Sequence, residues 1–350
     1  MALTLMTLNL RMTATMSDAE QLWQRFDGIG FDLDGVIYMG PVPVPGAPET
    51  LTELHRHGLP LAYVTNNASR PPSAVAAQLV GFGIDCAADD VVTSAQATAA
   101  LMGDALPPGA EVLIVGSAAL ADEVRAVGLT PQTERTGDTV AIVVGFDPKL
   151  TWDQLNEGCY AVQAGAAYFA CNDDWTRPTD RGVAIGMGAM LLAVGQVVGV
   201  APIMGGKPAR PLLDQARARL GATHPLFVGD RLNTDVEGAR AAGWSSLFVL
   251  SGGNGPADLV AATPQLRPDY LAASVAGLCE APREAIQDGD VWRCGGAAAW
   301  ASPNQSAVID APLTTQAEKL DAVWAVAKLV WWQRDNGIEL DATAALSQCG

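Results

Sequence analysis

Two carboxylates stand two residues apart at the end of an apolar run, in the segment Phe31-Asp32-Leu33-Asp34-Gly35. The run Ile29–Leu33 predicts a short buried strand, and Asp34-Gly35 predicts the loop that follows it. Open α/β sheets bind ligands at the carboxyl ends of their strands. There, one carboxylate could act as a nucleophile while the other moves a proton, with a divalent cation reducing their repulsion. The alternative is an ordinary turn, because Asp and Gly are common turn residues.

Three further polar clusters follow apolar runs later in the chain. They are Thr65-Asn66-Asn67, Gly205-Gly206-Lys207-Pro208 and Gly229-Asp230-Arg231, the last with Asp235 shortly after it. Hydroxyl and amide groups near a helix N-terminus can bind an anion, and a lysine on a Gly/Pro-framed loop is a point charge suited to phosphate. Each cluster alone also has a structural interpretation, since Thr, Asn and Asp are frequent helix caps and a lone lysine is common on surfaces.

The order of the four clusters resembles that of the haloacid dehalogenase superfamily of phosphatases, over roughly residues 28–275. By this resemblance, Asp32 attacks the phosphoryl group and forms an aspartyl-phosphate. Asp34 then protonates the leaving alcohol and later activates the water that hydrolyses the intermediate. A dehalogenase is not expected, because that chemistry does not need Asp34 as an acid.

The resemblance also implies how phosphate and metal are held. Thr65, Asn66 and Lys207 would bind the phosphoryl oxygens, where charge spreads in the transition state. The expected cofactor is Mg²⁺, which prefers a few carboxylates together with substrate phosphate and water. Its expected ligands are Asp32, the backbone carbonyl of Asp34 and Asp230, with Asp235 supporting through water.

Alternating strand and helix patterns predict an α/β fold with a Rossmann-like parallel-sheet core, over residues 28–82 and 196–280. Residues 83–195 are expected to form an inserted α/β domain that resembles the large C2-type cap of one subgroup of the superfamily. The segment Asn172-Asp173-x4-Pro178-Thr179-x2-Gly182 is similar to that subgroup's cap motif. Residues 1–27 are expected to be an N-terminal extension, with Met12 or Met16 as alternative starts and without a signal peptide.

Residues 289–350 lie outside this resemblance and predict a small α+β unit. A hairpin is expected from Val291 to Ile309, followed by a helix from Thr314 to Asn336 with one apolar stripe. The stripe comprises Leu320, Val323, Trp324, Ala327 and Trp331. This arrangement resembles the reduced acetyltransferase-like appendage of actinobacterial glycerol-3-phosphate phosphatases. Without a glycine loop for acetyl-CoA, we expect a packing or dimerisation module, so a homodimer is one prediction.

Composition limits the partners. The formal net charge is −17, from 38 acidic and 21 basic residues, which disfavours nucleic acid and anionic membranes. A small phosphorylated metabolite remains compatible, because charges are screened within about 8 Å at physiological salt. The uncharged segment 183–201 is interrupted by glycines and predicts a loop and a buried helix rather than a membrane span. Six scattered cysteines predict reduced thiols in the cytoplasm.

The family resemblance implies Mg²⁺-dependent hydrolysis of a small phosphomonoester, with glycerol 3-phosphate as the first candidate substrate. Phosphoglycolate or another small-metabolite phosphate is the nearest alternative. A phosphotransferase or mutase could use the same aspartyl-phosphate, and an inactive regulatory protein is the non-enzyme alternative. Substrate choice is expected to depend on the shape of the cap.

Overall fold

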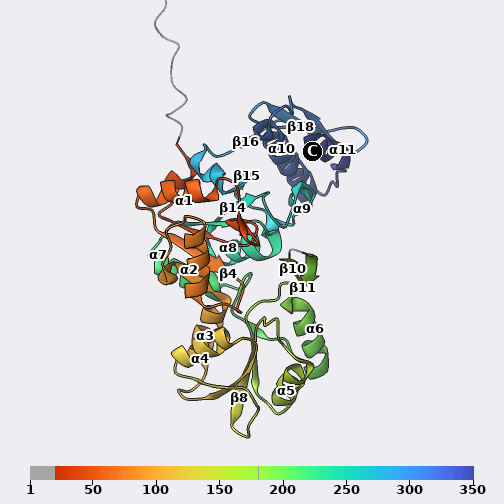
Figure 1. The fold of residues 1–350 in the computed structure, drawn as a ribbon. Helices are drawn as coiled ribbons and strands as arrows, with labels where there is room; N and C mark the ends of the chain where they lie inside the picture. Colours follow the sequence, from red (N-terminus) through yellow and green to blue (C-terminus); the bar gives the residue numbers. More distant parts are fainter. Residues whose placement is uncertain (1–19, 180) are drawn as a thin grey trace, which may run out of the picture.

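The computed structural model describes residues 20–179 and 181–350, which form three units that each contain a sheet (Figure 1). The expected alternative starts at Met12 and Met16 lie outside the described residues. Of the predicted extension over residues 1–27, the described part is not a separate segment. Leu22 and Phe26 are buried in the same apolar cluster as Ile29 and Phe31 of the first strand.

The core sheet has six parallel strands in the order β15-β14-β13-β1-β4-β5. Their bounds are β1 Gly28–Phe31, β4 Leu61–Thr65, β5 Val91–Thr93, β13 Pro225–Gly229, β14 Ser245–Val249 and β15 Tyr270–Ala272. The strands read as continuous apolar runs because both faces are covered by helices. One face packs against α1 (Ala47–Arg56) and α2 (Pro72–Gly81), and the other against α7 (Pro211–Leu220) and α8 (Glu237–Ala242).

The inserted sheet has five parallel strands in the order β12-β9-β8-β6-β7. Their bounds are β6 Glu111–Val115, β7 Thr130–Gln132, β8 Thr139–Val144, β9 Ala167–Ala170 and β12 Ile203–Met204. Helices α3 (Ser94–Ala105) and α4 (Ala118–Ala126) cover one face, and α5 (Trp152–Gln163) and α6 (Met187–Val198) cover the other. Figure 1 shows this unit at the end of the molecule opposite the C-terminal unit.

Strand pairing corrects both predicted boundaries of the insertion. Residues 91–93 form β5, which pairs with β4 in the core sheet, although the insertion was expected to start at 83. Residues 203–204 form β12, which pairs with β9 in the inserted sheet, although the core was expected to resume at 196. These strands have only two or three residues, too few for a periodic pattern to assign them to one sheet or the other.

Between β9 and α6 the chain forms a hairpin of β10 (Thr176–Thr179) and β11 (Gly182–Ile185). The helix expected in segment 183–201 is present as α6, but it is buried on one side only, since Leu192 and Val197 are exposed, and strand β11 replaces the expected loop. Within the described part of the chain, no helix combines the length and apolar character needed to cross a membrane.

The C-terminal unit is an antiparallel sheet, β16-β17-β18-β19, packed on the long helix α10 (Gln316–Asp335). The strands are β16 Ala285–Asp288, β17 Val291–Cys294, β18 Ala297–Ala301 and β19 Ala307–Asp310, and α11 (Thr343–Cys349) follows α10. Because β16 pairs with β17, the unit begins at 285 rather than at the expected residue 289.

Helix α10 is buried around most of its circumference rather than along a single stripe. One side of α10 packs on the C-terminal sheet, and the other side packs on α9 (Pro256–Ala261) and the edge strand β15. Trp324 and Trp331 are both buried and meet edge to face with ring centroids 5.6 Å apart. Trp331 donates a hydrogen bond through Nε1 to the carbonyl of Leu259, 3.1 Å away. The tryptophans are therefore buried against the core of the same chain.

Candidate active site

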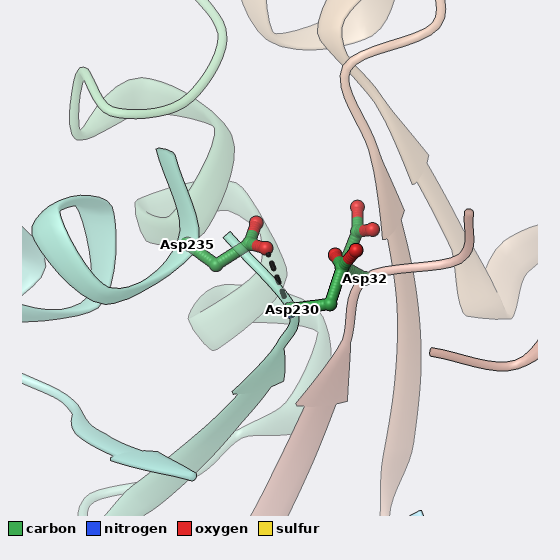
Figure 2. Close-up of side chains that lie close together, drawn as sticks. All are labelled: Asp32, Asp230 and Asp235. Atoms are coloured by element: carbon green, nitrogen blue, oxygen red, sulfur yellow. Dashed lines mark hydrogen bonds between the residues drawn. The ribbon is translucent and has the colours of Figure 1, made fainter. Parts of the chain in front are cut away.

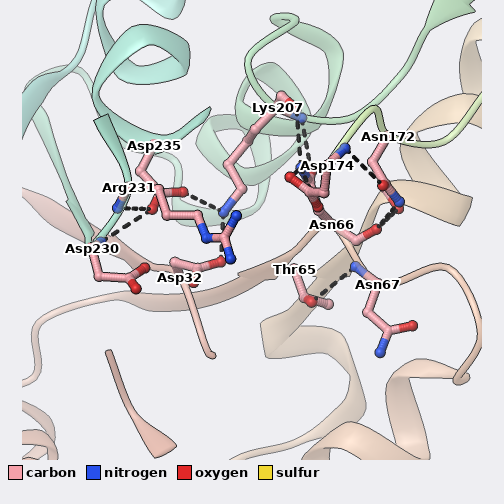
Figure 3. A network of polar contacts seen from close by, with 11 residues as sticks. Asp32, Thr65, Asn66, Asn67, Asn172, Asp174, Lys207, Asp230, Arg231 and Asp235 are labelled. Carbon is pink, nitrogen blue, oxygen red and sulfur yellow. Dashed lines mark hydrogen bonds and ion pairs between the residues drawn. The ribbon is translucent and has the colours of Figure 1, made fainter. Parts of the chain in front are cut away.

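Three of the predicted clusters meet because their strands are neighbours in the core sheet. Strand β1 lies between β13 and β4, all parallel, so their carboxyl ends share one edge. Asp32 follows β1, Thr65 ends β4, and Asp230 follows β13. Lys207 reaches the same place from the loop after β12 of the inserted sheet (Figure 3). The site is thus formed where the two parallel sheets present their carboxyl ends to each other.

Asp32, Asp230 and Asp235 form a compact cluster of carboxylates (Figure 2). Each offers one oxygen that lies within 4.8 Å of the others, the kind of grouping that can hold a metal ion. Asp235 is fixed in place because its Oδ2 accepts hydrogen bonds from the backbone N–H groups of Asp230 and Arg231, at 3.1 and 3.0 Å. Oδ1 of Asp230 is buried without a hydrogen-bond partner among the described residues.

Lys207 is a buried cation, only 1% exposed, inside this acidic cluster. Its Nζ atom donates to Oδ1 of Asp32 at 2.6 Å and to Oδ1 of Asp235 at 2.8 Å. Burial opposes its charge, but Asp235 and Asp32 outweigh burial and raise the pKa of Lys207. The lysine therefore remains charged and neutralises one of the three neighbouring carboxylates.

For the carboxylates, burial disfavours the ionised form and is the dominant effect on the pKa. Burial raises the pKa of Asp230 to about 7, and the nearby charge of Asp235 adds to this effect. Burial also raises the pKa of Asp32, and Lys207 counteracts this shift. Three carboxylates facing one ammonium leave an excess of negative charge that a divalent cation would neutralise. Together with the unpartnered Asp230 oxygen, this donor set fits Mg²⁺, whose ligands are oxygens.

The side chain of Asp34 is not one of the three clustered carboxylates, but it lines the cavity over them. Its side chain is accessible, whereas Asp32 is buried. The surrounding protein nevertheless desolvates it, which raises the pKa of Asp34. The next residue, Gly35, has φ +93°, and a Cβ atom there would lie 2.3 Å from Oδ2 of Asp230. The glycine of the Asp-x-Asp-Gly sequence is therefore required by the close packing of this loop against the strand end of β13.

Asn66 connects the core to the inserted unit. Its Oδ1 accepts from the backbone N–H of Lys207 at 2.9 Å, and its Nδ2 donates to the carbonyl of the same residue at 3.0 Å. Its own carbonyl accepts from Nδ2 of Asn172 at 2.7 Å and from Oγ of Ser94 at 2.6 Å. The side chain predicted to bind phosphate thus positions the Lys207 loop. Within the described part of the chain, Thr65 Oγ1 accepts a single hydrogen bond, from the backbone N–H of Asn67 at 3.1 Å.

A cavity of about 1320 Å³ opens over these groups. The residues of the predicted site all line it, and so do residues of the β10–β11 hairpin. Four charged residues that line it were not predicted: Asp174, in the loop after β9, Arg177 and Arg181, and Arg231, directly after Asp230. The loop of Asp174 was noted for its resemblance to a cap motif, and its position after a strand was the available signal. Arg177 of the hairpin also lines the cavity, and its guanidinium lies 4.7 Å from the ring centroid of Phe146.

Comparisons with known proteins point to one family. A model of haloacid dehalogenase-like hydrolases matches residues 29–130, and a model described as HAD-hydrolase-like matches residues 204–278. The chain is 44% identical over 255 residues to D-glycerol 3-phosphate phosphatase of Mycobacterium tuberculosis, covering 73% of this chain and 71% of the relative. It is 33% identical over 229 residues to the 5'-nucleotidase YutF of Bacillus subtilis, covering 65% of this chain and 88% of the relative.

Solved structures show the same relationship. The crystal structure of a glycerol phosphate phosphatase from Mycobacterium tuberculosis in complex with magnesium matches with a TM-score of 0.81 and 38% identity. That match covers 94% of this chain and 97% of the other. A p-nitrophenyl phosphatase from Archaeoglobus fulgidus matches with a TM-score of 0.67 and 27% identity, covering 73% of this chain and 99% of the other.

Proposed function

Because this chain belongs to the haloacid dehalogenase-like hydrolase family, we propose that it hydrolyses glycerol 3-phosphate to glycerol and inorganic phosphate, with Mg²⁺ as cofactor. The observation that carries the proposal is the meeting of Asp32, Asp230, Asp235 and Lys207 at the carboxyl ends of two sheets. The substrate assignment is supported by the names of the relatives that match most of this chain.

Asp32 is the proposed nucleophile. One carboxylate oxygen bonds to phosphorus while the bond from phosphorus to the glycerol oxygen breaks, which gives an aspartyl-phosphate. Asp34 donates its proton to the departing oxygen, so glycerol leaves neutral. The raised pKa of Asp34 favours this role because it keeps the group protonated at a higher pH than a solvated carboxyl.

The second step returns the enzyme to its starting state. Asp34, now ionised, accepts a proton from a water molecule whose oxygen attacks phosphorus. The bond between phosphorus and Asp32 breaks, phosphate is released, and Asp34 is protonated again. Lys207 and the N–H and hydroxyl groups around Thr65 offer donors to the phosphoryl oxygens in both steps. A fast transfer to an alcohol instead of water would make the protein a phosphotransferase.

Asp32 and Asp230 would hold the metal ion together with the backbone carbonyl of Asp34, and Asp235 would support it. When bound, Mg²⁺ would supply positive charge that neutralises the phosphoryl oxygens and lowers the repulsion between the phosphate and Asp32. The inserted unit would act as the cap that closes the cavity against bulk water. A cytoplasmic location is also proposed, since all six cysteines are free and five are buried.

The experiment that tests this proposal is a phosphate-release assay with Mg²⁺ over a panel of small monoesters. The panel contains glycerol 3-phosphate, 2-phosphoglycolate, sugar phosphates and nucleoside monophosphates, and Asp32→Asn protein prepared in parallel controls for contaminating phosphatases. We expect the highest kcat/KM with glycerol 3-phosphate. Preference for another monoester would reject the substrate, while transfer to an added polyol in excess of hydrolysis would reject the reaction class. Absence of turnover on every monoester would favour the inactive regulatory alternative.

A further inference from the structure

A carboxylate that the proposed mechanism does not use faces the catalytic cavity from the inserted unit. We propose that Asp174 is a specificity-determining residue that accepts hydrogen bonds from hydroxyl groups of the leaving alcohol. This inference rests on the proposed phosphatase function and deepens it, because it specifies that the site selects a polyol over an apolar or anionic leaving group.

Backbone contacts anchor Asp174 in the loop that follows β9. Its backbone N–H donates to Oδ1 of Asn172 at 3.3 Å, and its carbonyl accepts from the backbone N–H of Gly188 at 2.9 Å. A Cβ atom at Gly186 would lie 2.0 Å from the carbonyl oxygen of Asp174, so the loop packs directly on the start of α6. A side chain on such a loop is suited to specificity, because substrate binding need not order it first.

The Asp174 carboxylate has spare capacity to accept hydrogen bonds. Among the described residues its side chain has one donor, Nδ2 of Asn66, at 3.3 and 3.4 Å to the two oxygens. That same nitrogen makes a shorter bond, of 3.0 Å, to the carbonyl of Lys207. A carboxylate has about four acceptor sites, so most of them are open, and the residue lines the cavity.

Its charge state makes it an acceptor at neutral pH. Burial raises the pKa of Asp174 to about 6, while Lys207 and Arg231 limit the rise. The group is therefore mainly ionised at pH 7 and can bind hydroxyl donors but not another carboxylate. An apolar leaving group would leave the desolvated carboxylate without partners, a situation that sites built for hydrogen bonding reject strongly.

Asp174 lies where the leaving alcohol would be expected, beside the groups proposed to bind the phosphate. Asp174 touches Asn66, which directly follows Thr65 of the phosphate cluster and positions the loop of Lys207 (Figure 3). The carboxylate thus borders the phosphate-binding groups from the side of the inserted unit. A phosphoryl group in line with Asp32 must point its alcohol away from that nucleophile, toward the cavity that the inserted unit encloses.

The test compares three substrates with the same phosphoryl group: glycerol 3-phosphate, 1-propyl phosphate without the hydroxyls, and anionic 2-phosphoglycolate. Asp174→Ala should lower kcat/KM for glycerol 3-phosphate by roughly 10–100-fold, the range for a hydrogen bond to a charged group. The same variant should change kcat/KM for 1-propyl phosphate by less than about 3-fold. It should raise kcat/KM for 2-phosphoglycolate, because the negative charge that repels its carboxylate is removed. Asp174→Asn, which keeps one acceptor oxygen, should give an intermediate loss.

Asp173→Asn is the matched control, because Asp173 is exposed in the same loop. This substitution should leave kcat/KM unchanged for all three substrates. Equal losses on glycerol 3-phosphate and 1-propyl phosphate would overturn the inference, because Asp174 would then act through Asn66 on the position of Lys207. Thermal unfolding shows whether the Asp174→Asn protein is folded. A folded Asp174→Asn protein that still prefers glycerol 3-phosphate over 1-propyl phosphate as strongly as wild type would also overturn the inference. Wild-type protein that hydrolyses none of the three would reject the proposed function itself, an outcome that does not depend on any variant.

Discussion

Nζ of Lys207 lies 2.6 Å from Oδ1 of Asp32, although the two residues are 175 positions apart in the chain. The contact joins a loop of the inserted sheet to the first strand end of the core sheet. The same ammonium also binds Asp235, so one buried cation links the inserted unit to both acidic motifs of the core. Several consequences of this arrangement can be measured.

Replacing the nucleophile should abolish turnover without unfolding the protein. Asp32→Asn keeps the size of the side chain and an oxygen that can accept from Lys207, but an amide cannot attack phosphorus. We expect kcat to fall by at least about 10⁴-fold, as when a nucleophile is removed from other enzymes. Circular dichroism and unfolding by urea should show a folded variant. Retained turnover that co-purifies with the variant over successive columns would assign the attack to another group.

Removing the buried ammonium should be costly for stability. Lys207→Met leaves Asp32 and Asp235 buried without their common counter-ion, which typically costs about 3–5 kcal/mol. Urea unfolding in metal-free buffer at pH 7 measures the loss. Lys149→Met is the control, because Lys149 is exposed and its replacement should change stability by less than about 0.5 kcal/mol. Equal stabilities of the two variants would show that the carboxylates do not need the lysine.

Binding of Mg²⁺ should be visible without any substrate. The ion binds the folded state alone, so free Mg²⁺ at about 100 times its Kd should stabilise the wild type by about 2.7 kcal/mol. Asp230→Asn removes a ligand charge and should remove most of this gain, whereas exposed Asp104→Asn should keep it. Thermal unfolding with and without Mg²⁺ measures both, and EDTA should abolish wild-type turnover. An Mg²⁺-induced shift that is the same in all three proteins would place the ion elsewhere.

The pKa of Asp34 predicts a pH-dependent gain in stability when its charge is removed. Because burial raises its folded-state pKa, ionised Asp34 destabilises the folded state, and this cost appears as pH rises through the unfolded pKa of about 3.9. Asp34→Asn should therefore be more stable than wild type at pH 7 in metal-free buffer, and the difference should vanish near pH 3.5. Urea midpoints across this range measure it. An Asp34→Asn protein that is less stable than wild type at every pH would contradict the raised pKa of Asp34.

The C-terminal unit should contribute stability rather than chemistry. Trp331→Ala removes a buried indole from the shared core, which typically costs about 3–5 kcal/mol, while kcat of the folded protein should stay unchanged because no residue beyond Gly253 lines the cavity. Trp152→Ala is the control, since Trp152 is 75% exposed. Unfolding by urea and steady-state rates measure the two effects. A large fall in kcat at normal stability would show that this unit takes part in catalysis.

The residues proposed for the chemistry were singled out from the sequence, and the structure brings them to one cavity. Asp32, Asp34, Thr65 and Asp230 follow apolar runs that suit strands, and parallel strands end at one edge. Lys207 was added because the order of the four polar clusters resembles that of the superfamily. The α/β class followed from the periodic pattern, whereas the division into three units also rested on the family resemblance, and strand pairing moved its boundaries. Which role each residue plays in turnover stays a prediction for the experiments above.

Only the tertiary structure decided how the units meet and what faces the cavity. The short strands β5 and β12 are assigned by hydrogen bonding to distant strands, which no local pattern encodes. Helix α10 was expected to bury one stripe, but it is covered on two sides, since its neighbours and not its own periodicity set its burial. Asn66 and Asp174 lie 108 positions apart and touch across two units, a relationship that exists only because two sheets present their strand ends to the same cavity.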